Sequence, residues 1–198
     1  MWEGLDRLSP EMAEAGWLRG QPSDDRTAGP PPAAHSGLLR HQASYSRPYI
    51  AHASLGPSCA VAQLCGGRLT LWSHVQGVYL LRQALAEVLH LDPAAITVHH
   101  AHGAGCYGHN GADDAALDAA VIATLLPGTP IRLLWQREDE FGFEPLGTAM
   151  SIRLEAALGP DGRPIDLTTE IWSAPHVGGA RAAAALLATR VLPNPPPA

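Results

Sequence analysis

The stretch Ile96-Thr-Val-His-His-Ala-His-Gly-Ala-Gly-Cys-Tyr-Gly-His-Asn-Gly-Ala-Asp-Asp114 decides the fold. It begins with β-branched residues typical of a strand, continues as a loop with four glycines, and ends where an alanine-rich helical pattern starts. Glycine permits positive φ and lets a ligand approach the backbone closely, and Asp113 or Asp114 is suited to capping the helix that follows. A structural turn seldom needs this many glycines, so the loop is predicted to hold a cofactor.

Strands and helices alternate on both sides of this loop. Residues 60–64 and 69–73 are apolar runs separated by a Gly-Gly pair, which predicts a β-hairpin. Apolar residues then recur at helical spacing after Gly77, and again over residues 117–125 beyond the loop. Residues 131–135 open another strand, so strand and helix alternate twice along this part of the chain.

Residues 150–158 and 165–171 alternate apolar and polar side chains around the turn Gly159-Pro-Asp-Gly162, which predicts a long hairpin. The predicted fold class is therefore α/β (α+β), a mixed sheet with two packed helices and a long C-terminal β-hairpin. We expect residues 1–44 to be a linker or the edge of a preceding domain, and residues 45–178 to form one domain. Residues 179–198 form an Ala/Pro-rich tail, which suggests truncation.

Composition limits the function. The chain has 198 residues, of which 46% are hydrophobic, and a formal net charge of -6; this is the balance of a globular protein of one or two domains and disfavours nucleic acid as a partner. Cys59, Cys65 and Cys106 show no C-x-x-C spacing, so neither a disulfide framework nor a zinc knuckle is indicated. The sequence has no signal-peptide pattern and no membrane span, and we expect a cytoplasmic location.

Two other interpretations of the loop are open. Gly103-x-Gly105-x-x-Gly108 fits the dinucleotide fingerprint, but Glu138, the candidate acidic residue, lies about 30 residues further on where about 20 is usual. A nucleotide-binding oxidoreductase domain therefore remains an alternative. The loop region also holds side chains of the kinds that bind zinc, without a recognisable ligand spacing, which favours packed or hydrogen-bonded histidines. These side chains are His99, His100, His102, Cys106 and His109.

Four ordered motifs resemble the molybdopterin-binding large subunit of the xanthine dehydrogenase and aldehyde oxidase family, in particular its nicotinate dehydrogenase branch. They are Tyr45-Ser-Arg-Pro-Tyr-Ile-Ala-His-Ala-Ser-Leu-Gly-Pro-Ser-Cys-Ala-Val-Ala62, Trp72-Ser-His-Val-Gln-Gly77, Gly103-Ala-Gly-Cys-Tyr-Gly-His-Asn-Gly-Ala-Asp-Asp114 and Arg132-Leu-Leu-Trp-Gln-Arg-Glu-Asp-Glu140. The resemblance implies that residues 45–178 are the first part of a molybdopterin-binding domain. It implies an oxidoreductase that hydroxylates an N-heterocycle or an aldehyde with oxygen taken from water.

The same resemblance implies the cofactors and partners. Molybdenum-molybdopterin, in a dinucleotide form, would be the resident cofactor, with iron-sulfur clusters in a partner subunit or domain. The expected partners are that iron-sulfur subunit or another electron-acceptor protein, and the missing second half of the large subunit. An inactive remnant that retains the motifs is a further alternative.

Site residues are also implied by the resemblance. Gln76 matches the catalytic and cofactor-binding glutamine, whose amide can hydrogen-bond an oxygen of the molybdenum centre. Tyr107 and Gly108 match the aromatic-glycine pair beside the metal. Gly105 and Cys106 belong to the same cofactor-binding loop, and Cys106 stands where the family commonly has glycine.

The sequence also departs from the family pattern. His52 matches the histidine of a His-Ala motif that usually continues to Glu-Pro. Here Gly56-Pro57 stands at that position and lacks the glutamate. No segment matches the general-base glutamate, and residues 138–140 are expected to form a structural strand end with an ion pair to Arg137. We therefore expect this chain alone to be catalytically silent, with the apolar faces of its last two strands partly uncovered.

Overall fold

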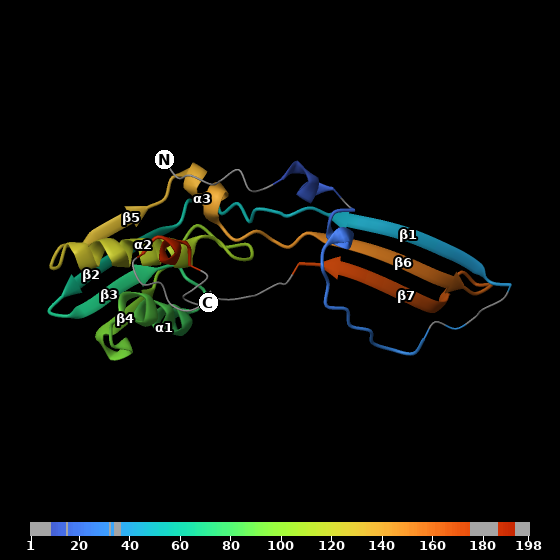
Figure 1. Ribbon diagram of the computed structural model, residues 1–198, viewed down its shortest axis with the longest axis horizontal. Helices are drawn as coiled ribbons and strands as arrows, with labels where there is room; N and C mark the ends of the chain where they lie inside the picture. Colours follow the sequence, from blue (N-terminus) through green and yellow to red (C-terminus); the bar gives the residue numbers. More distant parts are fainter. Residues whose placement is uncertain (1–8, 15, 32, 34–36, 175–185, 193–198) are drawn as a thin grey trace. The chain divides into compact units, whose positions relative to one another are not determined.

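The structure, a computed structural model, describes residues 9–14, 16–31, 33, 37–174 and 186–192 (Figure 1). The chain divides into two compact units: unit 1 comprises Met1–Ile50 and Thr148–His176, and unit 2 comprises Ala51–Gly147 and Val177–Ala198. Of the tail expected at residues 179–198, only residues 186–192 lie in the described part. No helix among the described residues is long and apolar enough to cross a membrane.

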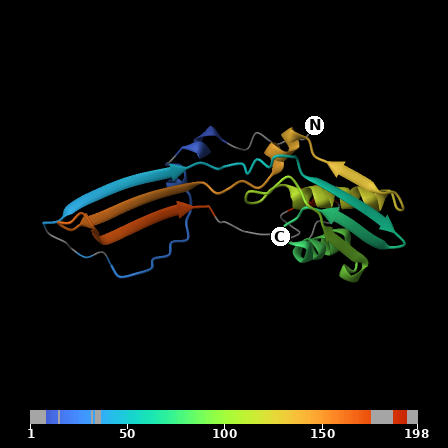
Figure 2. The same ribbon diagram turned by 180° about the vertical axis from the view of Figure 1, so that it is seen from behind.

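Unit 1 contains a three-stranded antiparallel sheet in the order β1-β6-β7. Both views show its strands β1 (Leu39–Arg47), β6 (Met150–Leu158) and β7 (Pro164–Ser173) side by side (Figures 1 and 2). The hairpin predicted from alternation is present as β6 and β7. β1 begins inside residues 1–44, the stretch expected to be a linker or the edge of a preceding domain. Its partner β6 is remote in sequence, since Gln42 pairs with Glu155, and local patterns therefore did not indicate this strand.

Unit 2 contains a four-stranded mixed sheet in the order β4-β3-β2-β5. Its strands are β2 (Cys59–Cys65), β3 (Arg68–Ser73), β4 (Ile96–His100) and β5 (Ile131–Leu134). β2 is antiparallel to β3 and β5, whereas β3 and β4 run parallel. The α/β class with a mixed sheet is thus confirmed, but the long hairpin joins a separate sheet with β1 and not this one.

Two helices make the connections in unit 2. α1 (Val78–Leu89) links the parallel strands β3 and β4, because parallel neighbours need a crossover connection. α2 (Ala112–Leu125) links β4 to β5 at the opposite edge of the sheet and packs against β2, β3 and β5. Alanines on α2 allow a close approach to the sheet, and leucines from the strands and both helices fill the core. The largest fully buried apolar side chains there are Leu69, Leu71, Leu81, Leu85, Leu117 and Leu186.

The expectation for residues 137–140 was wrong. These residues begin a short helix, α3 (Arg137–Phe143), instead of ending a strand. Asp139 accepts a hydrogen bond of 2.8 Å from the backbone N–H of Gln136, which fixes the first turn. The Arg137 guanidinium forms no ion pair with its acidic neighbours and donates instead to the carbonyl oxygens of Ser54 and Leu55, each at 2.6 Å.

Candidate cofactor site

The loop between β4 and α2 meets the end of β3 at the carboxyl edge of the two parallel strands. Gln76, which follows β3, donates a hydrogen bond of 2.7 Å from Nε2 to the carbonyl oxygen of Gly108. Open α/β sheets place ligands at the carboxyl ends of parallel strands. The structure therefore brings Gln76 together with the glycine loop.

The backbone of this loop is bent by left-handed residues. Gly105 has φ +93°, Tyr107 +56° and Gly108 +146°. For Tyr107 this conformation costs about 1–3 kcal/mol, so its surroundings must hold it in place. The Tyr107 side chain is 63% exposed, and a Cβ on Gly105 would lie 2.7 Å from its Cζ. The ring of Tyr107 thus folds over Gly105 while keeping an open face.

Cys106 stabilises the same turn. Its Sγ donates to the carbonyl oxygen of Gly108 at 3.2 Å and accepts from the backbone N–H of Asn110 at 3.4 Å. The thiol is thereby directed back into the loop. Cys106 therefore holds the turn, and a contact between this residue and the cofactor stays a prediction.

The loop leaves backbone donors available. Within the described part of the chain, the N–H groups of residues 104–109 donate no hydrogen bond, and most of these residues are exposed. Such N–H groups are suited to acceptor oxygens of a bound group. The pterin and phosphate oxygens of molybdopterin are acceptors of this kind, so the loop fits one side of that cofactor.

Asn110 organises the loop from below and was missed by the sequence analysis. It is 2% exposed, and its Nδ2 donates to the carbonyl oxygen of Gly105 at 3.1 Å and to Oγ of Ser54 at 3.4 Å. Its Oδ1 accepts from the backbone N–H of Ala112 at 3.1 Å, which fixes the turn that leads into α2. The signal was present, because asparagine often hydrogen-bonds the backbone two residues further on in such turns.

Asp113 and Asp114 do not cap α2, contrary to the expectation. Both are buried in its first turn. Asp113 lies 3.2 Å from Nε2 of His109, and Asp114 accepts from the backbone N–H of Leu187 at 2.9 Å. The helix begins at Ala112 with Gly111 at its N-cap, so both aspartates lie inside its first turn.

Glu140 joins three segments around the loop. It is fully buried, and its Oε2 accepts from the backbone N–H of Ser58 at 2.6 Å. Its Oε1 accepts from Oγ of Ser58 at 3.1 Å and from the backbone N–H of Gly111 at 3.2 Å. α3, the segment before β2 and the start of α2 are therefore tied together by one carboxylate.

This carboxylate also bears on the nucleotide-binding alternative. A dinucleotide fold binds pyrophosphate at the N-terminus of the helix after the glycine loop. Here Glu140 already accepts from the N–H of Gly111 at that end of α2, and two further acids occupy the first turn. Because a phosphate would meet like charge there, and because β2 runs antiparallel to both of its neighbours, this alternative is not favoured.

His74 packs beneath the loop in its neutral form. Its Nε2 accepts from the backbone N–H of Cys59 at 3.3 Å, and its Nδ1 lies 3.3 Å from Nδ2 of Asn110. Because Nε2 accepts from the N–H of Cys59, a protonated ring would place a second donor against that N–H and lose this hydrogen bond. Burial lowers the pKa of His74 below 6.5, and the charge of Glu140 opposes this shift only in part.

His52 closes the other side of the loop. Its Nδ1 lies 3.0 Å from the carbonyl oxygen of Pro145, so this nitrogen carries the proton. A Cβ on Gly108 would come within 2.2 Å of Cδ2 of His52, and this close packing requires glycine at position 108. The loop is thus supported by His52 and by His74, whose ring lies 2.5 Å from a Cβ built on Gly103.

The remaining histidines near the loop make local contacts. His99 stacks on Trp72 with ring centroids 5.4 Å apart, and Nδ1 of His100 lies 3.1 Å from the carbonyl oxygen of Val75. His102 packs edge-on against His100. Among the described residues, no group of three His, Cys, Asp or Glu side chains could hold a metal ion.

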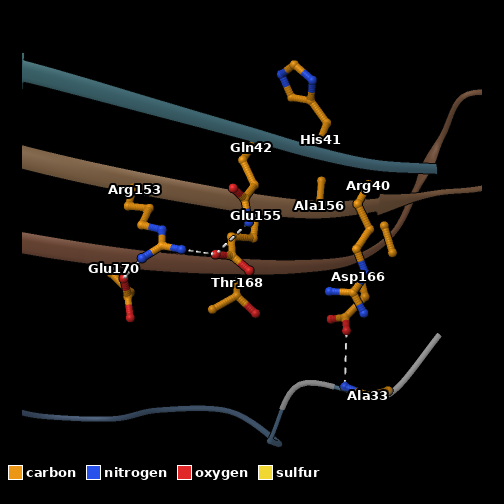
Figure 3. A pocket seen from close by; sticks show the side chains of 11 residues that line it. Ala33, Arg40, His41, Gln42, Arg153, Glu155, Ala156, Asp166, Thr168 and Glu170 are labelled. Atoms are coloured by element: carbon orange, nitrogen blue, oxygen red, sulfur yellow. Dashed lines mark hydrogen bonds and ion pairs between the residues drawn. The ribbon is translucent and has the colours of Figure 1, made fainter. Parts of the chain in front are cut away.

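A cavity of about 290 Å³ lies on the sheet of unit 1 (Figure 3). Charged groups line it, but they neutralise one another: Arg153 lies 2.6 Å from Glu155 and 4.0 Å from Glu170. Gln42 donates to the same Glu155 at 3.1 Å. No residue of the glycine loop lines this cavity, so it is not the candidate cofactor site.

The fold is that of a molybdopterin-binding domain. Residues 32–191 match the molybdopterin cofactor-binding domain family, and the chain belongs to that family. It is 36% identical over 166 residues to a nicotinate dehydrogenase polypeptide of Pseudomonas putida, one of the subunits of that enzyme. That match covers 81% of this chain but only 14% of the relative.

Solved structures share the fold. Quinoline 2-oxidoreductase from Pseudomonas putida 86 superposes with a TM-score of 0.57 at 22% identity, over 69% of this chain and 17% of the other. The aldehyde oxidoreductase from Desulfovibrio desulfuricans superposes with a TM-score of 0.58 at 14% identity, over 83% of this chain and 20% of the other. At these identities the two matches show a common fold.

Proposed function

We propose that this chain forms part of the molybdenum-cofactor-binding subunit of a molybdenum hydroxylase. The observation that carries the proposal is the hydrogen bond between Gln76 and Gly108 in a member of the molybdopterin-binding family. The names of two similar proteins, nicotinate dehydrogenase and quinoline 2-oxidoreductase, both specify nitrogen heterocycles. The sequence led us to expect either an N-heterocycle or an aldehyde as the substrate. These two names favour an N-heterocycle, oxidised with oxygen from water.

The residues of this chain have distinct roles in that proposal. When bound, the molybdenum-pterin group supplies the two-electron oxidation of the substrate carbon. Gln76 uses one N–H for Gly108 and retains a second N–H and its carbonyl oxygen for a neighbouring acceptor or donor. The exposed ring of Tyr107 screens one side of the site from water, and Gly105 and Gly108 let the loop N–H groups approach the bound group.

The proposal includes further components. The cofactor would carry molybdopterin in its dinucleotide form, with iron-sulfur clusters in a partner subunit or domain. The nicotinate dehydrogenase relative is one subunit of its enzyme, which supports partner polypeptides, and its greater length supports a second wall of the site outside this chain. Because small-molecule sites usually bury most of their ligand, this chain alone should bind the cofactor weakly. The cytoplasmic location stays a prediction.

The test uses the chain isolated from its own source with the polypeptides that remain bound to it. Molybdenum is measured by mass spectrometry and the pterin by fluorescence after oxidation; both should be present. Gln76→Ala should lower substrate turnover at equal molybdenum content, whereas Tyr79→Ala, which truncates an aromatic residue 73% exposed on α1, should not. Bound NAD or FAD in place of the pterin would establish the nucleotide alternative, and a pterin-loaded assembly without turnover would establish the inactive remnant.

Substitution of Gly108 is not a usable test of cofactor binding. A branched side chain there would collide with His52 before any ligand is considered. Loss of molybdenum from such a variant would report misfolding of the loop. Tyr107→Ala is preferable, because its exposed ring can be removed without creating a clash.

A further inference from the structure

A strained turn before β2 supports the glycine loop. Ala53 has φ +52°, in the left-handed region that residues other than glycine seldom adopt. Such a conformation persists only where the surroundings hold it, and strained residues cluster at functional sites. His52 precedes Ala53, and its ring packs against Gly108. Ser54 follows, and its Oγ accepts from Nδ2 of Asn110 at 3.4 Å. The turn therefore bears directly on the loop.

The chain that leaves this turn also contacts the loop. The backbone N–H of Leu55 donates to the carbonyl oxygen of Ala104 at 3.3 Å. A Cβ on Gly56 would lie 2.9 Å from the Cβ of Ala104, so the two segments pack closely there as well. Because residues 52–56 contact the loop at both of its ends, a change in the backbone of Ala53 would be transmitted to the loop.

The two residues that follow α3 hold the turn. Oε1 of Glu144 accepts from the backbone N–H of Ala53 at 3.3 Å, and the carbonyl oxygen of Pro145 lies 3.0 Å from Nδ1 of His52. The first hydrogen bond fixes the strained residue, and the second fixes the ring beside it. The strained conformation is thus supported from the end of α3, 91 positions away in the sequence.

The carboxylate of Glu144 is buried with few hydrogen bonds. Its side chain is 5% exposed, and in the described part of the chain its Oε2 is buried without a hydrogen-bond partner. Glu140, the other buried acid of this region, accepts three hydrogen bonds. Buried carboxylates usually require pairing or several donors, so Glu144 is costly for the fold. A residue of this kind beside a strained turn indicates a role in the site.

We propose that Glu144 is a positioning residue of the glycine loop. By holding Ala53 in its left-handed conformation, it sets the ring of His52 against Gly108 and the hydroxyl of Ser54 against Asn110. Glu144 acts through these residues, because its own side chain is buried. The inference rests on the proposed function, since the group that the positioned loop binds is the molybdenum-pterin cofactor.

Three substitutions separate positioning from stability. Glu144→Gln keeps an oxygen for the N–H of Ala53 and places its NH₂ where Oε2 accepts no hydrogen bond, so the loop should be unchanged. Glu144→Leu removes the acceptor and fills the space with an apolar side chain, which need not lower stability where a buried carboxylate has few partners. Glu138→Leu is the matched control, because Glu138 lies on α3 and is exposed.

The first measurement uses the full chain without cofactor. Amide hydrogen exchange at Ala53 and Leu55 should be about tenfold faster in Glu144→Leu, and native in Glu144→Gln and Glu138→Leu. The urea concentration at half-unfolding should not fall in Glu144→Leu. Native exchange in Glu144→Leu would overturn the proposal. A Glu144→Leu chain that unfolds at lower urea, or fails to fold, would also overturn it, because Glu144 would then serve stability.

The second measurement uses the assembly isolated with its bound polypeptides. Molybdenum is followed by mass spectrometry during dialysis, and its half-time of loss should be about tenfold shorter in Glu144→Leu than in the native assembly. Glu144→Gln should retain molybdenum as the native assembly does. Faster exchange at Leu55 with unchanged retention of molybdenum would overturn the positioning role. A native assembly without molybdenum contradicts the proposed function itself, and this is seen before any variant is compared.

Discussion

Replacing Glu140 by Gln tests whether one buried carboxylate holds the cofactor loop together. The substitution turns one acceptor oxygen into an NH₂ donor and removes the negative charge, while the shape of the side chain is retained. Ser58 and Gly111 present three donors to Glu140, with backbone N–H distances of 2.6 Å and 3.2 Å and a hydroxyl at 3.1 Å. In either orientation of the amide, one buried backbone N–H of Ser58 or Gly111 faces the new NH₂ and loses its acceptor.

The magnitude follows from that single loss. An unsatisfied buried N–H costs about 1–3 kcal/mol, and removal of a buried charge offsets part of this. We therefore expect Glu140→Gln to lower the free energy of unfolding by about 1–3 kcal/mol. Glu140→Ala, which removes the acceptors of both backbone N–H groups, should cost about 2–6 kcal/mol.

The assay is urea denaturation combined with amide hydrogen exchange. Exchange should speed up at Ser58 and Gly111 in Glu140→Gln, because these two N–H groups bond to the carboxylate. Glu138→Gln is the matched control, since Glu138 lies on the same helix and is exposed; it should change the free energy of unfolding by less than ~0.5 kcal/mol. Unchanged exchange and unfolding in Glu140→Gln would refute the idea that Glu140 holds the loop.

Three further outcomes can be measured by the same denaturation assay. Gly111→Ala should destabilise unit 2, because its Cβ would lie 2.2 Å from Cζ3 of Trp135. Gly142→Ala, near the C-terminal end of α3 with nothing within 4 Å of its Cβ, should be neutral or stabilising by less than about 1 kcal/mol, and equal effects of the two substitutions would contradict this packing. Since burial lowers the pKa of His74, its contribution to stability is complete above pH 6.5 and is lost as the pH falls through the lower folded value. His74→Gln should flatten that pH dependence, and an unaltered pH profile would exclude His74 as its source. Burial raises the pKa of Asp118 above 3.8 despite its hydrogen bond from Trp135, so its contribution is lost as the pH rises through the higher folded value, and Asp118→Asn should be at least as stable as the native chain at neutral pH; a less stable variant would contradict this sign.

Local sequence patterns correctly predicted most elements of the fold. The Gly-Gly hairpin, helices α1 and α2, and the hairpin of β6 and β7 were evident because each depends on neighbours within about one element length. The proximity of Gln76 to the glycine loop could also be expected, since each follows a strand and the carboxyl ends of parallel strands share one edge. Family membership followed from the same ordered motifs.

Only the tertiary structure shows which distant segments pair or contact one another. β1 pairs with β6 across 113 positions at Gln42 and Glu155, and no local periodicity reveals the partner of a strand. The sequence placed Glu140 in a strand end beside Arg137, and only the packing of α3 against the start of α2 buries it as the acceptor of Gly111. A sequence pattern records which side chains are apolar and how they repeat, whereas the bonding partner of a buried polar group depends on which distant segments the fold brings to it.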